Sequence, residues 1–290
     1  MTDELAFVEA LRALAWNPAA RNLDDDCAVL EIGDTALVIT HDAMAEGLHF
    51  LPDQDPADVA WKLVASNVSD LAAKGADPLG VMLGYQFGHD DLRFLDGFKE
   101  ALGAFELILL GGDSISSTGA QVLGLTAIGL ATHRPVPSRA GAKPGDTLWI
   151  TGPVGAAMMG LEALQTGKGD STAYRRPGAL VGEGMVLAPH VSAIMDVSDG
   201  LLLDAARMAR ASGVTLAIDS EAVPLAAPEE RRDEALRWGE DYQLLFTLPP
   251  GATPPIEASR IGQARKASTA PILLDGALLS EADGLGYRHS

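Results

Sequence analysis

The sequence predicts an α/β chain in the α+β arrangement, made of two domains of similar size. The 290 residues exceed one average domain, and two domains of about 130 to 150 residues each are the natural expectation. Short apolar runs with strand character alternate with segments whose apolar residues recur at helical spacing. A segment rich in proline, glycine and basic residues, 134–145 (RPVPSRAGAKPG), separates two such series. We therefore expect domains at 1–135 and 136–290.

The first domain is expected to contain a mixed or antiparallel sheet with helices on one of its faces. Helical spacing occurs at 4–15, 56–74 and 91–104. Strands are expected at 27–32, 36–40, 79–87, 106–110 and 121–131. Gly33-Asp34 is a hairpin signal between the first two strands. Pro56 suits the first turn of its helix, and Gly75 lies beyond the end of that helix.

The second domain is expected to repeat the alternation of helices and strands. Helices are predicted at 154–166, 180–189, 200–212 and 229–238. Strands are predicted at 147–151, 191–196, 214–219 and 243–248, with two further short candidates around 259–265 and 271–279.

The charge of the chain restricts its partners. There are 40 acidic and 21 basic residues, so the formal net charge is -19. Such a surface repels nucleic acid and anionic membranes, and we expect neither as a partner. An anionic substrate would need divalent cations or local basic groups, although solubility alone could also account for the bulk of the charge.

One cysteine, Cys27, excludes an intramolecular disulfide and a multi-cysteine zinc site. Its three neighbouring aspartates should raise the thiol pKa, so we expect a buried small residue rather than a nucleophile. The N-terminus does not resemble a signal peptide, and no uncharged stretch reaches the roughly 18 residues of a membrane span. We expect a soluble, cytoplasmic protein.

Six short acidic clusters recur along the chain, several beside glycine, serine or asparagine. They are 24–26 (DDD), 40–42 (THD), 67–70 (NVSD), 111–113 (GGD), 196–200 (DVSDG) and 239–241 (GED). Several follow strand-like runs, and strand ends converge on one edge of a sheet. Hard oxygen ligands gathered there would suit Mg²⁺ carrying a polyphosphate.

Three of these clusters have structural alternatives. Segment 111–114 is expected to be a turn after strand 106–110, where glycines expose N–H groups to an anion, although it could also be an ordinary turn. In 196–200, Ser198 or Asp199 could merely cap a helix, but capping leaves Asp196 unexplained. The polar residues of 67–70 interrupt an apolar helix, where burial without partners costs about 1–3 kcal/mol each. They could instead form a solvated face, with Lys74 pairing with Asp70.

Other phosphate-handling motifs are absent from the sequence. It contains no P-loop, no Gly-x-Gly-x-x-Gly that opens a helix and no Gly-x-Ser-x-Gly elbow, and its histidines lack metal spacing. Loop 151–155 could hold a phosphate, although close packing of the following helix is the simpler interpretation. An enzyme that uses phosphates here must therefore rely on metal ions and positioning.

Taken in order, seven blocks resemble the thiamine-monophosphate kinase family of the aminoimidazole ribonucleotide synthetase-like superfamily. They are 25–28 (DDCA), 40–50 (THDAMAEGLHF), 67–76 (NVSDLAAKGA), 111–113 (GGD), 138–146 (SRAGAKPGD), 196–201 (DVSDGL) and 239–247 (GEDYQLLFT). The resemblance spans about 20–263, with a weaker tail at Gly286-Tyr287. The blocks at 46–50 and 239–242 point to this kinase family rather than to other members of the superfamily.

The resemblance implies a two-domain synthetase-like fold, a homodimer formed by the N-terminal halves, and active sites near that interface. It implies direct transfer of the γ-phosphoryl group of ATP to thiamine monophosphate, without a phosphoenzyme and with several Mg²⁺ ions. The implied metal ligands are Asp26, Thr40, Asp42, Asp70, Asp113, Asp196 and Asp199. The implied ATP contacts are Gly112, Asp113, Arg139 and Ser198. The implied thiamine contacts are His49, Glu240 and Tyr287.

Several positions depart from the family pattern. His41 stands where threonine is usual, and we expect its ring to ligate Mg²⁺ or to point away while its backbone contributes. Leu23-Asp24 and Ser114 are further departures, and Asp24 and Asp25 are left without a role as solvated neighbours. Two alternatives remain: a sister ATP-using enzyme such as aminoimidazole ribonucleotide synthetase, and a non-catalytic nucleotide-binding protein.

Overall fold

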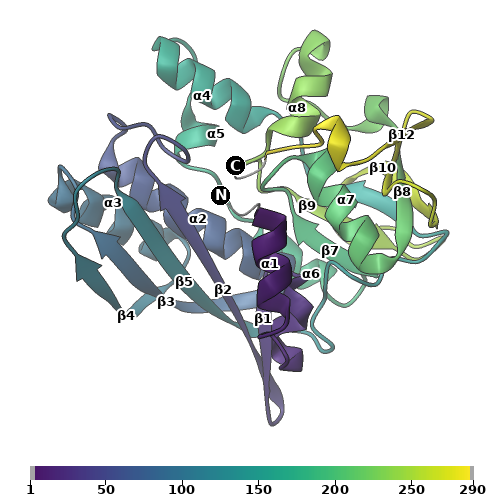
Figure 1. The fold of residues 1–290 in the computed structure, drawn as a ribbon, viewed down its shortest axis with the longest axis horizontal. Coiled ribbons are helices and arrows are strands. Elements are labelled where there is room, and N and C mark those ends of the chain that lie inside the picture. Colours follow the sequence, from purple (N-terminus) through teal and green to yellow (C-terminus); the bar gives the residue numbers. More distant parts are fainter. Residues whose placement is uncertain (1–3, 288–290) are drawn as a thin grey trace.

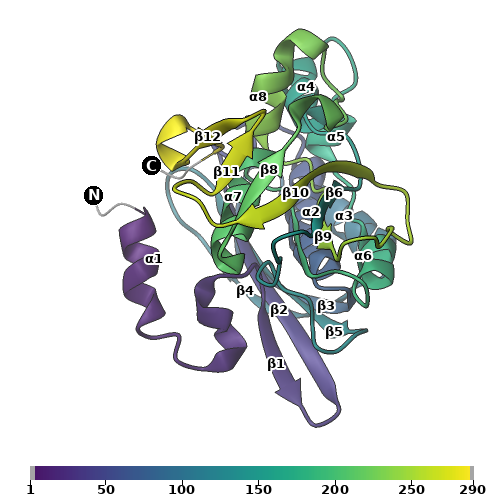
Figure 2. The same ribbon diagram turned by 90° about the vertical axis from the view of Figure 1, so that its right-hand side faces the viewer.

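The computed structural model describes residues 4–287, which form two β-sheets with helices packed against them (Figures 1 and 2). The first sheet has the order β1-β2-β5-β3-β4. Its strands are β1 (Ala28–Ile32), β2 (Thr35–Ala45), β3 (Ala76–Gln86), β4 (Ile108–Ile115) and β5 (Val122–Ala131). The accompanying helices are α1 (Glu4–Arg12), α2 (Pro56–Ala73) and α3 (Asp91–Ala104), with a 3₁₀ segment at Pro18–Leu23.

The second sheet has the order β12-β11-β8-β10-β6-β9-β7. Its strands are β6 (Thr147–Ile150), β7 (Ala193–Asp196), β8 (Val214–Ile218), β9 (Leu244–Leu248), β10 (Ser259–Lys266), β11 (Ile272–Leu274) and β12 (Ala277–Leu279). Its helices are α4 (Ala156–Thr166), α5 (Thr172–Arg175), α6 (Val181–Leu187), α7 (Leu201–Ser212) and α8 (Arg232–Trp238). The predicted α/β architecture with two sheets is confirmed. Among residues 4–287, no helix is both long and apolar enough to cross a bilayer.

The first sheet is mixed, because β1, β2, β5 and β3 pair antiparallel whereas β4 runs parallel to β3. Helices α2 and α3 cover one face, as predicted (Figure 1). The strands therefore alternate: in β2 the side chains of Ala36 and Val38 are buried, whereas those of Leu37 and Ile39 are only half-buried on the other face. That second face, which we call the outer face, carries many apolar side chains, although His41 and Thr126 also lie on it.

Helix α2 lies between the two halves of the molecule. It packs against β2, β3 and β5 on one side and against α6 and β7 on the other, so nearly all of its residues are buried. Pro56 occupies its first turn, and the carboxylate of Asp55 accepts a hydrogen bond from the N–H of Ala57 (3.0 Å). Gly75 follows with φ of 59°, and a Cβ there would lie 2.4 Å from the Cβ of Ala188. Only glycine permits this close approach.

Two strands of the first sheet extend well beyond their predicted C-terminal ends. Strand β2 extends to Ala45, so Thr40 and Asp42 lie within it and face α2. Strand β4 extends to Ile115, so the predicted turn at 111–114 is wrong. Parallel pairing with β3 continues through these residues, with Leu83 opposite Gly112. A Cβ on Gly112 would lie 2.0 Å from the carbonyl oxygen of Leu83, so the close approach of the two strands requires glycine at this position.

Candidate metal and nucleotide site

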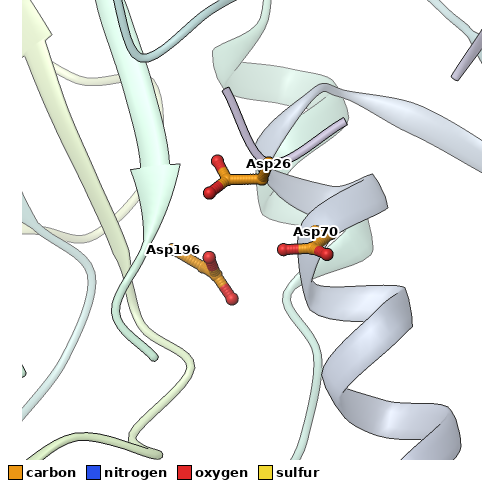
Figure 3. Close-up of side chains that lie close together, drawn as sticks. All are labelled: Asp26, Asp70 and Asp196. Carbon is orange, nitrogen blue, oxygen red and sulfur yellow. The ribbon is translucent and has the colours of Figure 1, made fainter. Parts of the chain in front are cut away.

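Three aspartates from separate elements converge at the junction of the two sheets (Figure 3). Asp26 lies two residues before β1, Asp70 lies in α2, and Asp196 ends β7. One carboxylate oxygen from each lies within 4.8 Å of the others. The expected convergence of carboxylates from both halves of the chain is therefore present for these three residues.

The electrostatics of this cluster favour a bound cation. Burial, followed by the charges of Asp42 and Asp196, raises the pKa of Asp70 well above its usual value. Burial and the charge of Asp26 raise the pKa of Asp196 to about 8. Burial and Asp26 also raise the pKa of Asp42 to about 6. A divalent cation would relieve this repulsion, and carboxylate oxygens are the ligands that Mg²⁺ prefers.

The other polar residues around the cluster all have partners within the protein. The hydroxyl of Thr40 donates to Asp70 (2.5 Å), and the hydroxyl of Ser69 donates to Asp196 (2.6 Å). The side-chain oxygen of Asn67 accepts a hydrogen bond from the N–H of Asp42 (3.0 Å). The alternative of a solvated face on α2 is therefore wrong, because these groups are buried and hold the carboxylates in place.

Two cations bind the carboxylate of Asp26. Lys74, which is completely buried, donates to it (2.9 Å), and Arg139 from the second half of the chain binds the other oxygen. Burial alone would raise the pKa of Asp26, but Arg139 and Lys74 hold it well below its usual value. Lys74 also pairs with Asp25 (2.6 Å), a buried carboxylate that Arg21 contacts from its other side.

These pairs correct two expectations from the sequence. Lys74 does not serve Asp70, because its side chain leaves α2 toward Asp25 and Asp26 instead. Asp25 is not a solvated neighbour: its side chain is 1% exposed, and ion pairs are what make such burial tolerable. A lysine at the end of an apolar helix was the available signal for a buried ion pair.

The segment after β7 is held by two residues that sequence reasoning missed. The carboxylate of Asp204, in the first turn of α7, accepts hydrogen bonds from the N–H groups of Ser198 and Asp199 (both 3.0 Å). Arg207 bridges Asp204 (2.8 Å) and Asp199 (2.5 Å). The capping expected of Ser198 or Asp199 is therefore wrong: the N-cap of α7 is Gly200, which has no side-chain cap, and Asp204 instead holds the backbone of the segment before the helix. The spacing from Ser198 to Asp204 was the only available signal.

Gly112 and Asp113 are not gathered with the three aspartates. Asp113 is exposed on edge strand β4, in a row with Gly84 of β3, Gly124 of β5 and Ala43 of β2. Three strand spacings of about 4.8 Å place it about 14 Å from Ala43. A cleft of about 430 Å³ lies beside it, lined by Leu83, Tyr85, Phe87, Asp91, Phe94, Leu95, Leu109 and residues 111–114.

The residues expected to contact thiamine lie at another part of the junction between the two halves. The side chain of Glu240 pairs with Lys62 of α2 (2.5 Å), and Lys62 also donates to the carbonyl oxygen of His49 (2.9 Å). The N–H of Tyr287 donates to the carbonyl oxygen of Asp199 (2.9 Å), so the C-terminal tail reaches the same region. Lys62 was not foreseen.

The contacts of His41 and of the loop at 151–155 decide between the alternatives that the sequence left open for each. The ring of His41 lies on the outer face, with Nδ1 2.9 Å from the hydroxyl oxygen of Thr126, so it points away from the aspartates. At 151–155 the start of α4 is occupied, because the carboxylate of Asp241 accepts hydrogen bonds from Gly155 (2.8 Å) and Ala157 (3.2 Å). Cys27 is a buried core residue, as expected, and its burial raises the pKa of the thiol.

This fold and site define a class of two-domain proteins. The model described as AIR synthase related protein, N-terminal domain, matches residues 24–131. The model described as AIR synthase related protein, C-terminal domain, matches residues 143–255. Together they include the three converging aspartates, with Asp26 and Asp70 in the first match and Asp196 in the second.

Individual relatives narrow the class. The thiamine-monophosphate kinase of Salmonella typhimurium is 36% identical over 253 residues, covering 78% of this chain and 76% of the relative. That of Caulobacter vibrioides is 37% identical over 256 residues, covering 81% and 73%. The structure of AaThiL complexed with AMPPCP and TMP matches with a TM-score of 0.85 and 28% identity, over 96% of this chain and 94% of that chain. The chain belongs to the thiamine-monophosphate kinase family.

Proposed function

We propose that this protein transfers the γ-phosphoryl group of ATP to thiamine monophosphate, producing thiamine diphosphate and ADP. The observation that carries this proposal is the convergence of Asp26, Asp70 and Asp196 from both halves of the chain. Family membership and the AaThiL complex with AMPPCP and TMP support it over a sister ATP-using activity or a non-catalytic role. Phosphoryl transfer depends mainly on positioning and charge neutralisation, which such a site provides without a covalent residue.

The acidic groups would hold several Mg²⁺ ions. When bound, these ions would neutralise the charge on the transferring phosphates. Asp26, Asp70 and Asp196 form the centre of this ligand set, and Asp42 and Asp199 are its electrostatic neighbours. Thr40, which lies on the same face of β2 as Asp42, orients Asp70 through its hydroxyl group.

The nucleotide would lie between Arg139, Ser198 and strand β4. The Nε–H of Arg139 is buried without a hydrogen-bond partner among residues 4–287, so this guanidinium has a donor to offer a phosphate oxygen. The apolar cleft beside Gly112 and Asp113 would accept the base. At the other end of the site, His49, Glu240 and Tyr287 would contact the thiamine portion. The carboxylate of Glu240 would face its cationic rings, and Tyr287 would stack on them.

A homodimer would bring these parts together. The outer face of the first sheet carries apolar side chains on four strands. Leu30, Leu37 and Leu130 form one cross-strand row, Ile39 and Ile128 lie in the next, and Met82 lies in the third beside Thr126 and His41. A second copy on this face would bury it through a self-complementary contact. It would also bring Asp113 of one copy toward the aspartates of the other. We place the protein in the cytoplasm, as domains 1–135 and 136–290, without nucleic-acid partners.

The proposed activity is tested by incubating the protein with ATP, Mg²⁺ and thiamine monophosphate and separating the products by chromatography. Thiamine diphosphate and ADP are expected in equal amounts. Asp42→Ala is the control, because Asp42 is predicted to hold metal and its loss should abolish the product. Failure of the wild-type protein to exceed this control would reject the kinase. A phosphorylated protein that passes its label to thiamine monophosphate would reject direct transfer.

A further inference from the structure

Lys62 is a buried cation whose contacts are all made within the protein. Its side chain is 1% exposed, and its ammonium group lies 2.5 Å from Glu240 and 2.9 Å from the carbonyl oxygen of His49. The same nitrogen lies 3.8 Å from the centre of the Tyr174 ring. Lys62 thus makes an ion pair, a hydrogen bond and a cation–π contact, each with a group of the protein. These contacts arrange Lys62 to hold protein groups.

The groups that Lys62 holds belong to three separate segments. Glu240 comes from the loop before β9, His49 from the loop after β2, and Tyr174 from α5. The carbonyl oxygen of His49 also accepts a hydrogen bond from the hydroxyl of Tyr174 (3.2 Å). Two of the three segments thus carry the residues to which a thiamine contact was given, and Lys62 is the element that they share.

The backbone of Glu240 is fixed by contacts of its own, so only the side chain remains to be anchored. Its N–H donates to the carbonyl oxygen of Ser198 (2.8 Å), and its φ of 58° is unusual for a residue with a side chain. The carboxylate of the next residue, Asp241, is tied to the start of α4. The remaining freedom of Glu240 is in its side chain, and the ion pair with Lys62 removes it.

Helix α2 also links this pair to the metal cluster. Ser69, which donates to Asp196, follows Lys62 by seven residues. Seven residues are close to two full turns, so the two side chains share one helical face about 10 Å apart along the axis. One rigid helix therefore spaces the Glu240 contact from the carboxylates that would hold the phosphate-bearing metal.

We propose that Lys62 is a positioning residue for the acceptor pocket, which fixes Glu240 and the His49 loop so that they receive the cationic ring system of the acceptor. This inference rests on the proposed kinase function. Lys62 acts on the rings of the acceptor through Glu240 and His49, and does not bind the phosphate of the acceptor.

The test compares thiamine with thiamine monophosphate, because only the second carries a phosphate. In Lys62→Met, calorimetric affinity for both compounds should fall by a similar factor of about tenfold or more, the loss expected when one buried ion pair stops orienting a pocket. Affinity for a non-hydrolysable ATP analogue should remain unchanged. Lys62→Arg should recover part of the loss. Lys168→Met, at an exposed lysine outside the site, is the matched control.

The affinities of Lys62→Met distinguish the positioning role of Lys62 from direct binding of the phosphate, and they leave the proposed kinase function to a separate test. If Lys62→Met loses affinity for thiamine monophosphate but not for thiamine, Lys62 binds phosphate and the positioning role is overturned. Unchanged affinity for both compounds overturns it as well. Should Lys62→Met fail to fold, Tyr174→Phe removes only the second hydrogen bond to His49 and should weaken both compounds in the same proportion. The kinase proposal itself fails only if the wild-type protein makes no thiamine diphosphate.

Discussion

The guanidinium of Arg139 is hydrogen-bonded to the carboxylate of Asp26, across the junction between the two halves of the molecule. One partner is proposed to hold phosphate and the other to hold metal. Their charges offset each other in a buried environment where an unpaired charge would be costly. On this proposal a metal ion at Asp26 and a phosphate at Arg139 would each replace the same ion pair, and occupation of Asp26 by a cation would release Arg139 toward the phosphates.

Arg139→Lys should weaken binding of a non-hydrolysable ATP analogue by about tenfold or more, because a lysine cannot reproduce the planar, two-pronged contact of a guanidinium. Thiamine affinity should change little, since His49 and Glu240 are held by other contacts. Calorimetric titration of each ligand in the presence of Mg²⁺ measures this. Arg265→Lys, on the exposed end of β10, is the matched control. Equal analogue affinities for both variants would remove Arg139 from the nucleotide site.

The metal-free protein should lose stability as pH rises from about 5 to about 8. The pKa of Asp196 is raised to about 8 and that of Asp42 to about 6, against 3.8 when unperturbed. The folded state therefore binds more protons than the unfolded state in this range, and the free energy of unfolding falls as they leave. Mg²⁺ should stabilise increasingly over the same range, because protons compete for its ligands.

Thermal unfolding in chelator and in Mg²⁺, repeated across this pH range, checks both trends. Asp196→Asn removes the group with the higher pKa and should flatten the decline measured in chelator. A melting temperature that rises with pH in chelator would contradict the proposed sign.

Much of the fold could be predicted from local patterns. Alternation marked the strands, and Pro56 and Gly75 marked the ends of α2. Strand β4 was misjudged because Gly111, Gly112 and Asp113 are turn formers locally, whereas pairing with β3 is a tertiary effect. Local sequence patterns do not show which strand a segment will pair with in the folded sheet.

The candidate site, like the fold, could be predicted only in part. Asp26, Asp70 and Asp196 were marked by acidic residues beside apolar runs, and they do meet. The buried cation Lys62 was missed because a lysine is usually a surface residue, and Lys74 was given the wrong partner, Asp70 instead of Asp25 and Asp26. Their roles depend on partners 178 and 48 residues away, Glu240 for Lys62 and Asp26 for Lys74. No local pattern encodes contacts between such distant segments.

Ser69→Ala should lower both stability and turnover. The hydroxyl of Ser69 donates to Asp196 across the junction of the two halves, and both residues are buried. Loss of this donor should cost about 1–3 kcal/mol in the free energy of unfolding. Denaturant titration and steady-state kinetics measure the two effects. Ser117→Ala, in an exposed loop, should leave both unchanged. Unaltered stability in Ser69→Ala would show that this hydrogen bond does not contribute.

Gly112→Ala and Gly111→Ala form a matched pair. A Cβ at Gly112 would collide with the carbonyl oxygen of Leu83, whereas nothing lies within 4 Å of a Cβ at Gly111. Gly112→Ala should therefore distort the pairing of β4 with β3 and reduce affinity for the ATP analogue. Gly111→Ala should fold normally and bind the analogue more nearly as the wild type does. Equal losses in both variants would point to ligand contact at both glycines instead of strand geometry at one.

Met82→Asp should convert the proposed homodimer into a monomer. Met82 is 46% exposed on the outer face, opposite Thr126 of the neighbouring strand, and a charge there could not be buried against a second copy. Leu92→Asp is the control, because Leu92 is 75% exposed on α3, away from that face. Sedimentation velocity distinguishes the two. Wild-type protein that sediments as a monomer would reject the dimer at once.

The dimer also predicts complementation between two inactive variants. If Asp113 of one copy serves the Asp26 cluster of the other, a mixed dimer of Asp26→Asn and Asp113→Asn contains one site with both aspartates intact. Mixing the two variants under conditions that allow subunit exchange should then restore part of the activity. If both residues act within one chain, every site in the mixture lacks one of them and activity stays absent. The estimated distance of about 14 Å from Asp113 to β2, three strand spacings away, favours the shared arrangement.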